Sequence, residues 1–139
     1  MGWSQKMKAT LDTNVLLRAV VQDDPVQSAT AANLLRDVEL VAVSTTSLCE
    51  FCWVLARGYK FDRSDIARAV RALTQSENVA STKAAVEAGL AVLDAGGDFA
   101  DGVIAFEGQR LGGEVFVTFD KTAATLVGAS GVSVKLLSA

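Results

Sequence analysis

Short apolar runs typical of β-strands alternate along this chain with segments in which apolar residues recur at helical spacing. The strand-like runs are residues 8–11, 39–43, 115–119 and 132–137, with 78–80 as a shorter strand or an extended link. The helical segments between them are residues 13–21, 25–36, about 47–58, 62 or 64 to 73, 82–93, 98–111 and a short helix from about 122. This alternation predicts an α/β fold of three layers, in which a central parallel sheet is flanked by helices.

The length and the apolar content point to one domain. The chain has 139 residues, half of them hydrophobic, which is enough for one well-buried core and too little for two ordinary domains. We therefore predict a single domain over residues 7–139, preceded by a flexible extension at residues 1–6. The sequence shows no signal peptide and no apolar run long enough to cross a bilayer, so we expect a cytoplasmic protein that is not attached to a membrane.

Charge and the absence of histidine exclude several kinds of chemistry. The net charge is -3 and the chain contains no histidine. An acidic chain has no global basic field, which argues against a sequence-reading DNA-binding protein but not against a nuclease whose acids hold cations. Without histidine the chain cannot form a Ser/His/Asp triad or a Cys/His catalytic pair. It also lacks a histidine pair for metal-free RNA cleavage. Acid–base chemistry must therefore come from carboxylates, lysines or metal-bound water.

The two cysteines, Cys49 and Cys52, form one C-x-x-C pair in a predicted helix. A single pair of this kind is a weak signal for redox chemistry or metal binding. Their neighbours Phe51, Trp53 and Val54 are apolar, and a free cysteine packs as a small hydrophobic residue. We therefore expect the cysteines to be packed in the core.

A local excess of basic residues lies between residues 57 and 71, where Asp62 and Asp65 are the acids. The basic residues are Arg57, Lys60, Arg63, Arg68 and Arg71. They fit an ordinary solvated helix face or a track for RNA phosphates, because Lys and Arg contacts to phosphates give sequence-independent affinity. Tyr59 and Phe61 either add stacking surfaces for bases or pack against the core.

Acidic residues stand where the predicted strands end and the helices begin. Asp12 and Asp120 each follow a strand, Glu50 lies in the helix after the second strand, and Asp98 and Asp101 stand at a helix start. Each has a simple alternative, since the aspartates are good N-caps and residues 47–50 fit a capping box. In a doubly wound sheet, however, strand ends and helix starts share one edge, so these acids can converge.

Carboxylates that converge repel one another and need a cation or protons to coexist. Hard oxygen ligands of this kind suit Mg²⁺ or Mn²⁺. The predicted chemistry is metal-assisted attack of water on a phosphodiester. The predicted metal ligands and catalytic residues are Asp12, Asp101 and Asp120, with Glu50 completing the cluster and Asp98 as a further ligand or an N-cap. The residues expected to orient water or substrate are Thr13, Asn14 and Thr118.

Four motifs of the chain resemble the PIN-domain ribonucleases, and within them the VapC toxins of toxin–antitoxin pairs, over about residues 7–137. The motifs are LDTNVLLR with Asp12, SLCEFCWVLARGY with Glu50, GGDFADGVIA with Asp98 and Asp101, and VFVTFDK with Thr118 and Asp120. The resemblance implies a PIN-like fold, a Mg²⁺ or Mn²⁺ site, endonuclease action on RNA, a small antitoxin protein that blocks the site, and a homodimer. Asp101 is favoured over Asp98 as the third acid because it directly precedes the apolar GVIA run.

The leading hypothesis is thus a metal-dependent ribonuclease that acts as a toxin, and two others remain. An aspartate-dependent phosphatase or phosphoacceptor domain would use Asp12 as its nucleophile, but one such pattern requires a second Asp where this chain has Asn14. A catalytically inactive PIN-like module would serve partner binding alone. The presence of every acidic position argues against that third reading.

Overall fold

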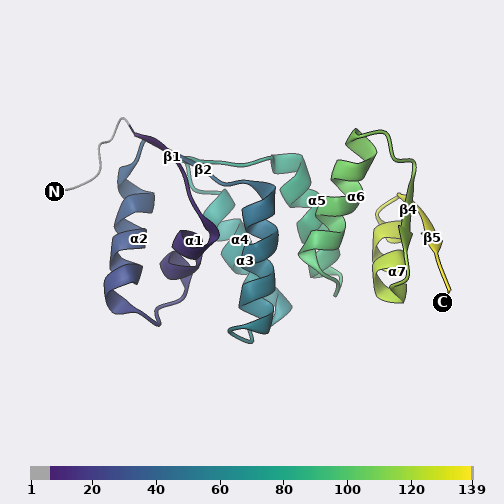
Figure 1. Ribbon diagram of the computed structural model, residues 1–139, viewed down its shortest axis with the longest axis horizontal. Coiled ribbons are helices and arrows are strands. Elements are labelled where there is room, and N and C mark those ends of the chain that lie inside the picture. The colour runs from purple at the N-terminus through teal and green to yellow at the C-terminus, as the bar shows by residue number, and fades with distance from the viewer. Residues whose placement is uncertain (1–6, 139) are drawn as a thin grey trace. The chain divides into compact units, whose positions relative to one another are not determined.

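The computed structural model describes residues 7–138, in which helices and strands alternate as the sequence predicts (Figure 1). These residues form two compact units, the first ending at Ser81 and the second beginning at Thr82. The predicted flexible extension, residues 1–6, lies outside the described residues. Among residues 7–138, no helix is both long and apolar enough to span a membrane. A single domain over residues 7–139 stays a prediction.

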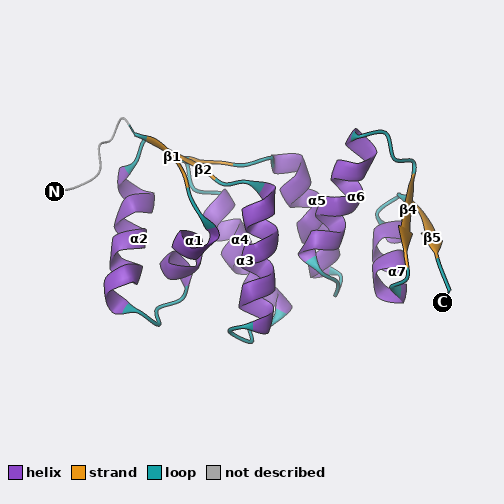
Figure 2. Cartoon of the chain, viewed as in Figure 1, coloured by secondary structure: helices purple, strands orange, loops and turns teal. Residues whose placement is uncertain are grey.

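Residues 7–81 form a parallel three-stranded sheet and four helices (Figure 2). The strands, in their spatial order, are β1 (Lys8–Thr10), β2 (Leu40–Ala42) and β3 (Val79–Ala80). The helices are α1 (Thr13–Val20), α2 (Pro25–Asp37), α3 (Thr45–Arg57) and α4 (Arg63–Thr74). Val41 pairs with Ala9 on one side and with Val79 on the other, so β2 is the central strand. Parallel neighbours joined through helices confirm the predicted α/β connection.

The core of the first unit is built by β2 together with α1, α3 and α4. Val41 of β2 is fully buried, and so are Leu16 of α1, Phe51 of α3 and Val70 of α4. Each helix repeats apolar residues every three or four positions, which allows one face to be buried. Cys52 lies on the buried face of α3 as expected, whereas Cys49 is half-buried.

Aspartate side chains fix the starts of α2 and α4. Asp24 accepts a hydrogen bond from the backbone N–H of Gln27 at 3.1 Å, and Pro25 follows it as the first helical residue. Asp62 accepts a hydrogen bond from the backbone N–H of Asp65 at 2.9 Å. This bond and the hydroxyl of Ser64 lower the pKa of Asp62. Both helix starts agree with the sequence-based expectation.

The start of α3 differs from the prediction. Ser44 is the N-cap, and its hydroxyl accepts a hydrogen bond from the backbone N–H of Ser47 at 3.1 Å. A helix start at about Ser47 is therefore wrong, and so is a capping box at residues 47–50. Four consecutive hydroxyl residues can each serve as a cap, so the sequence leaves the choice open. As a result, Glu50 lies within α3, where its carboxylate has no capping task.

Residues 82–138 form a second unit around a parallel pair of strands. Its elements are α5 (Lys83–Asp94), α6 (Phe99–Arg110), β4 (Val115–Thr118), α7 (Lys121–Ala129) and β5 (Ser133–Leu136). Val92, Ala105 and Val127 form its buried cluster, and Phe116 and Val134 of the two strands pack against them. The strand predicted at 115–119 is confirmed, although alternate residues of it, Val115 and Val117, are 51% and 53% exposed.

Helices α5 and α6 approach each other closely at two glycines. A Cβ atom on Gly102 of α6 would lie 2.2 Å from the backbone oxygen of Ala88 in α5. A Cβ atom on Gly89 of α5 would lie 2.6 Å from the ring of Phe99 in α6. Glycine is therefore required at both positions for this spacing, because a real Cβ atom does not fit at such distances.

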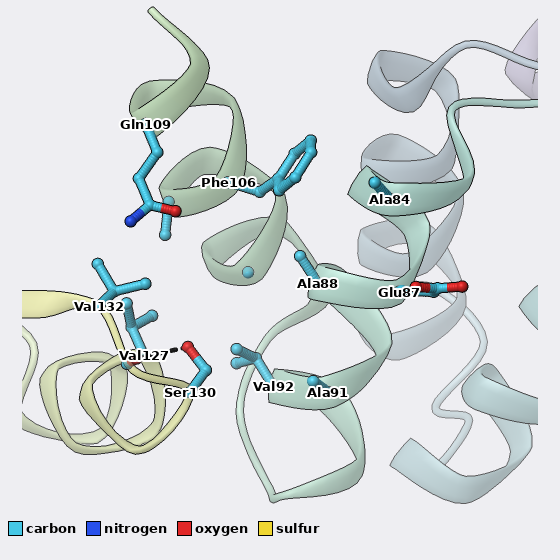
Figure 3. A pocket seen from close by; sticks show the side chains of 12 residues that line it. Ala84, Glu87, Ala88, Ala91, Val92, Phe106, Gln109, Val127, Ser130 and Val132 are labelled. Carbon is cyan, nitrogen blue, oxygen red and sulfur yellow. Dashed lines mark hydrogen bonds between the residues drawn. The ribbon is translucent and has the colours of Figure 1, made fainter. Parts of the chain in front are cut away.

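A cavity of about 390 Å³ opens between α5, α6 and α7 (Figure 3). Its wall is mostly small and apolar, and Glu87 and Gln109 bring polar groups to it. The hydroxyl of Ser130 at its edge donates a hydrogen bond to the carbonyl of Val127 at 2.6 Å. The cavity lining, all of it among the described residues, contains none of the predicted site residues.

Candidate active site

Asp12 lies between β1 and α1, as the sequence predicts. It is the N-cap of α1, and its carboxylate accepts a hydrogen bond from the backbone N–H of Thr13 at 2.8 Å. The capping interpretation is thus correct. The carboxylate nevertheless stays exposed to solvent, so capping leaves it open to a cation or a substrate.

Glu50 of α3 is brought to the same place by Thr13. The buried Thr13 hydroxyl donates a hydrogen bond to Glu50 Oε1 at 3.0 Å, across 37 positions of sequence. Thr13 therefore contacts both acids, Asp12 through its N–H and Glu50 through its O–H. The first unit holds a pair of carboxylates around one threonine, and Thr13 acts as the residue that positions them.

Asn14 has a different environment from Thr13. Its side chain lines a shallow groove of about 420 Å³ between α1 and α2, together with Val15, Arg18 and Leu34. A role for Asn14 in orienting water or substrate stays a prediction.

The second unit holds a second group of acids, Asp98, Asp101 and Asp120. Asp98 occupies the N-cap position of α6, but its side chain makes no capping hydrogen bond. Asp101 lies in the first turn of α6 and is half-buried. Asp120 is the N-cap of α7, where its carboxylate accepts a hydrogen bond from the backbone N–H of Ala123 at 3.0 Å. In this second group, the N-cap interpretation is confirmed by a hydrogen bond for Asp120, as it is for Asp12 in the first unit.

Asp101 is affected by its burial and by the two other acids of this group. Burial raises the pKa of Asp101 above its ordinary value, and the negative charges of Asp98 and Asp120 raise it further. A raised carboxyl pKa means that the surroundings disfavour the charged form. Within the second unit, the structure thus brings together the acids that the sequence placed at one helix start and one strand end.

Thr118 supports the second group from the end of β4. Its hydroxyl oxygen accepts a hydrogen bond from the backbone N–H of Asp120 at 3.0 Å. This bond fixes the turn that carries Asp120 from the strand into α7. Thr118 is therefore a positioning residue for that acid.

The donor chemistry of both groups fits a divalent cation. Carboxylate oxygens are the ligands that Mg²⁺ and Mn²⁺ prefer, and Asp12, Glu50, Asp98 and Asp120 are all exposed. A bound cation would also offset the negative charges of Asp98 and Asp120 that act on Asp101. Among residues 7–138, no three acidic or thiol side chains stand close enough together to hold a metal ion as they are.

Comparison with known families decides the class of the protein. The model of the PIN domain family matches residues 9–127, most of the chain, and this range includes all five acids. The chain belongs to the PIN domain family. Curated proteins were also compared, and none of them matches the chain.

Membership of this family confirms the expected fold and supports the general kind of function. The PIN domain is an α/β fold with parallel strands, in agreement with the elements described above. PIN domains are typically nucleases and generally use divalent metal ions, which supports a nuclease-type function in general terms.

The basic residues predicted to contact RNA lie at the end of α3 and along α4 of the PIN domain. Arg57 ends α3, Lys60 follows in the loop with a positive φ of 59°, and Arg63 begins α4. Arg68 forms a salt bridge with Asp65 three residues before it on α4. The ordinary helix-face interpretation therefore describes Arg68 well.

Tyr59 has a hydrogen-bonding role that its sequence context does not reveal. Its hydroxyl donates to Asp23 at 2.9 Å and accepts from Arg18 at 3.2 Å. Arg18 also pairs with Asp23 at 3.2 Å, and these bonds raise the pKa of its guanidinium. Tyr59 thus ties the loop after α3 to α1.

Trp53 is the residue whose environment the sequence suggested least well. It stands among apolar residues in the sequence, yet its side chain is 61% exposed. The Arg57 guanidinium carbon lies 5.8 Å from the centroid of its ring. An aromatic residue followed by arginine at the fourth position is the sequence signal that could have pointed to this pair.

Proposed function

We propose that this PIN domain is a Mg²⁺- or Mn²⁺-dependent endoribonuclease that acts as the toxin of a toxin–antitoxin pair. The observation that carries the proposal is the pairing of two exposed carboxylates, Asp12 and Glu50, by the N–H and O–H of the buried Thr13. Exposed carboxylate oxygens are the ligands that Mg²⁺ and Mn²⁺ prefer.

The proposed ligands are Asp12, Glu50, Asp101 and Asp120, with Asp98 as a further one. When bound, a divalent cation supplies a Lewis acid that polarises water and offsets charge on the phosphodiester. Thr13 holds Asp12 and Glu50 through its N–H and O–H, so neither carboxylate has to be ordered when the substrate binds. Thr118 does the same for Asp120 through the backbone of the turn.

The biological part of the proposal rests on the resemblance of the four motifs to VapC toxins. It includes cytoplasmic RNA as the substrate, a small antitoxin protein as the inhibitor, and a homodimer as the assembly. The alternatives of a phosphoacceptor domain and of an inactive interaction module have no specific observation in their favour.

The nuclease proposal is tested by cleavage of single-stranded RNA. We expect Mg²⁺ or Mn²⁺ to support cleavage, EDTA to stop it, and Asp12→Asn to abolish it while keeping the helix cap. The loss of cleavage activity should exceed roughly 10- to 100-fold, which is the loss when a residue hydrogen-bonded to a metal ligand is mutated. Asp62→Asn is the matched control, because Asp62 caps α4 in the same way but is no proposed ligand. Cleavage that persists in EDTA would contradict the proposal.

The toxin proposal needs a separate test in cells. We expect expression of the chain alone to arrest growth, and Asp12→Asn to relieve the arrest at equal protein level. Harmless expression of the active protein would contradict the toxin role while leaving the nuclease intact.

A further inference from the structure

One side of α3 carries an acid, an aromatic ring and an arginine in succession. Glu50, Trp53 and Arg57 follow one another at spacings of three and four, so they lie along one face of the helix. With a rise of about 1.5 Å per residue, Trp53 lies about 4.5 Å and Arg57 about 10.5 Å along the axis from Glu50. The ring therefore stands about one turn from an acid of the candidate active site.

The exposure of this face is unusual for its side chains. Trp53 is 61% exposed, whereas Phe51 and Leu55 on the opposite side of α3 are fully buried in the core. Trp53 thus adds little to the hydrophobic core of its unit. A ligand that covers this exposed aromatic ring would bury apolar surface that its present surroundings leave in water.

The Arg57 guanidinium gives this ring a preference for nucleic acid. It stacks over the Trp53 ring, with its carbon 5.8 Å from the ring centroid, and is itself exposed. Lys60 and Arg63 continue the positive charge beyond the end of α3. A flat aromatic surface next to exposed cations complements a base and its phosphate, which is how single-stranded RNA is held without sequence readout.

We propose that Trp53 and Arg57 form a stacking subsite for a base of single-stranded RNA beside the scissile phosphodiester. The ring of Trp53 takes the base, and Arg57 takes the adjoining phosphate while remaining stacked on the ring. This inference rests on the proposed RNA-cleaving function, because it assigns that substrate a position relative to Glu50.

The direct test uses the fluorescence of Trp53. The chain has two tryptophans, so Trp3→Phe leaves Trp53 as the sole tryptophan. Titration with oligouridine and oligoadenosine in EDTA should quench its emission, because stacking places a base against the ring. Inorganic polyphosphate has the charge of RNA without its bases, and it should bind the same surface with little quenching. Because EDTA stops metal-dependent cleavage, this result does not depend on whether the chain is a nuclease.

Affinity provides the second measurement. Trp53→Ala should weaken binding of labelled RNA by about fivefold to about a hundredfold, the range for loss of base stacking, and Trp53→Phe should retain most of the affinity. Arg57→Gln should weaken binding and reduce its dependence on salt. Arg110→Gln is the matched control, since Arg110 stacks on Phe106 at 5.9 Å in the second unit. In cleavage assays, Trp53→Ala should raise KM much more than it lowers kcat.

Several outcomes would overturn the subsite. RNA binding without quenching of Trp53, or an unchanged affinity of Trp53→Ala, would remove the ring from the RNA site even if cleavage is confirmed. Dissociation of a dimer by Trp53→Ala, with RNA affinity unchanged, would assign the ring to an interface between two copies. Quenching together with a failure to cleave any RNA would keep the subsite and refute the nuclease.

Discussion

Replacing Gly102 by alanine should separate α5 from α6 and disturb the acids of the second unit. The new Cβ atom would lie 2.2 Å from the backbone oxygen of Ala88 and 2.8 Å from the Cα atom of Gly89. An ordinary contact between carbon and a carbonyl oxygen is about 3.3–3.6 Å, so the helices must part by about 1 Å. Asp101 directly precedes Gly102 and moves with it.

The expected loss of stability follows from two opposing terms. Overpacking costs about 1–3 kcal/mol, and the obstacle here is backbone rather than a flexible side chain, so we expect about 3 kcal/mol. Alanine also favours the helix over glycine by about 1 kcal/mol. The net expectation for Gly102→Ala is a free energy of unfolding lower by about 2 kcal/mol.

Urea denaturation followed by circular dichroism measures this difference, and Gly108→Ala provides the control within the same helix. A Cβ atom on Gly108 meets no atom within 4 Å, so this variant should be more stable than the parent by about 1 kcal/mol. RNA cleavage by Gly102→Ala should fall under conditions in which the protein is still folded. Equal stability of the two variants would refute the close approach of α5 and α6.

Two further predictions concern the first unit. Thr13→Val removes the hydroxyl that donates to the exposed Glu50, which should lower the free energy of unfolding by about 1 kcal/mol and also lower the cleavage rate. Thr13→Ser keeps a hydroxyl and should preserve both the stability and the rate. Equal cleavage rates for the two variants would contradict a positioning role for Thr13. Burial raises the pKa of the Cys52 thiol to about 12, above the 9.0 of the unfolded chain, so stability should fall as the pH rises from 9 towards 12. Thermal unfolding of Cys52→Ala should lack this part of the pH dependence, and a slope identical to that of the parent would contradict the burial of the thiol.

The order of strands and helices was predictable because local signals agree with one another. Asp24 followed by proline marks the start of α2 in sequence and in structure, and the capping bond of Asp62 confirms one of the two choices for α4. The start of α3 was not predictable, because any of the hydroxyl residues at 44–47 can cap a helix. In the structure Ser44 is the cap, and its hydroxyl accepts a hydrogen bond from the backbone N–H of Ser47.

The sequence predicted which elements carry the acids of the candidate site, but not the contacts that these acids make. Aspartates after strands and at helix starts were expected to lie near one another, and Asp98, Asp101 and Asp120 do so within the second unit. The bond between Thr13 and Glu50 joins positions 37 residues apart, which no local pattern contains. The exposure of Trp53 was not predictable either, since an apolar residue type does not show whether its face of the helix packs against the core or faces solvent.

The helix positions of the acids account for the choice between aspartate and glutamate at each place. Asp12 and Asp120 cap helices, and only the shorter side chain reaches the backbone N–H groups from that position. Their negative charge also interacts favourably with the helix dipole, so two carboxylates of the candidate site stabilise the fold that carries them. Glu50 lies inside a helix, where glutamate is a better helix former than aspartate and its extra methylene lets it reach Thr13. Replacing Asp12 and Asp120 by glutamate and Glu50 by aspartate would therefore keep the charge of these positions. The two helix caps and the hydrogen bond to Thr13 would be lost.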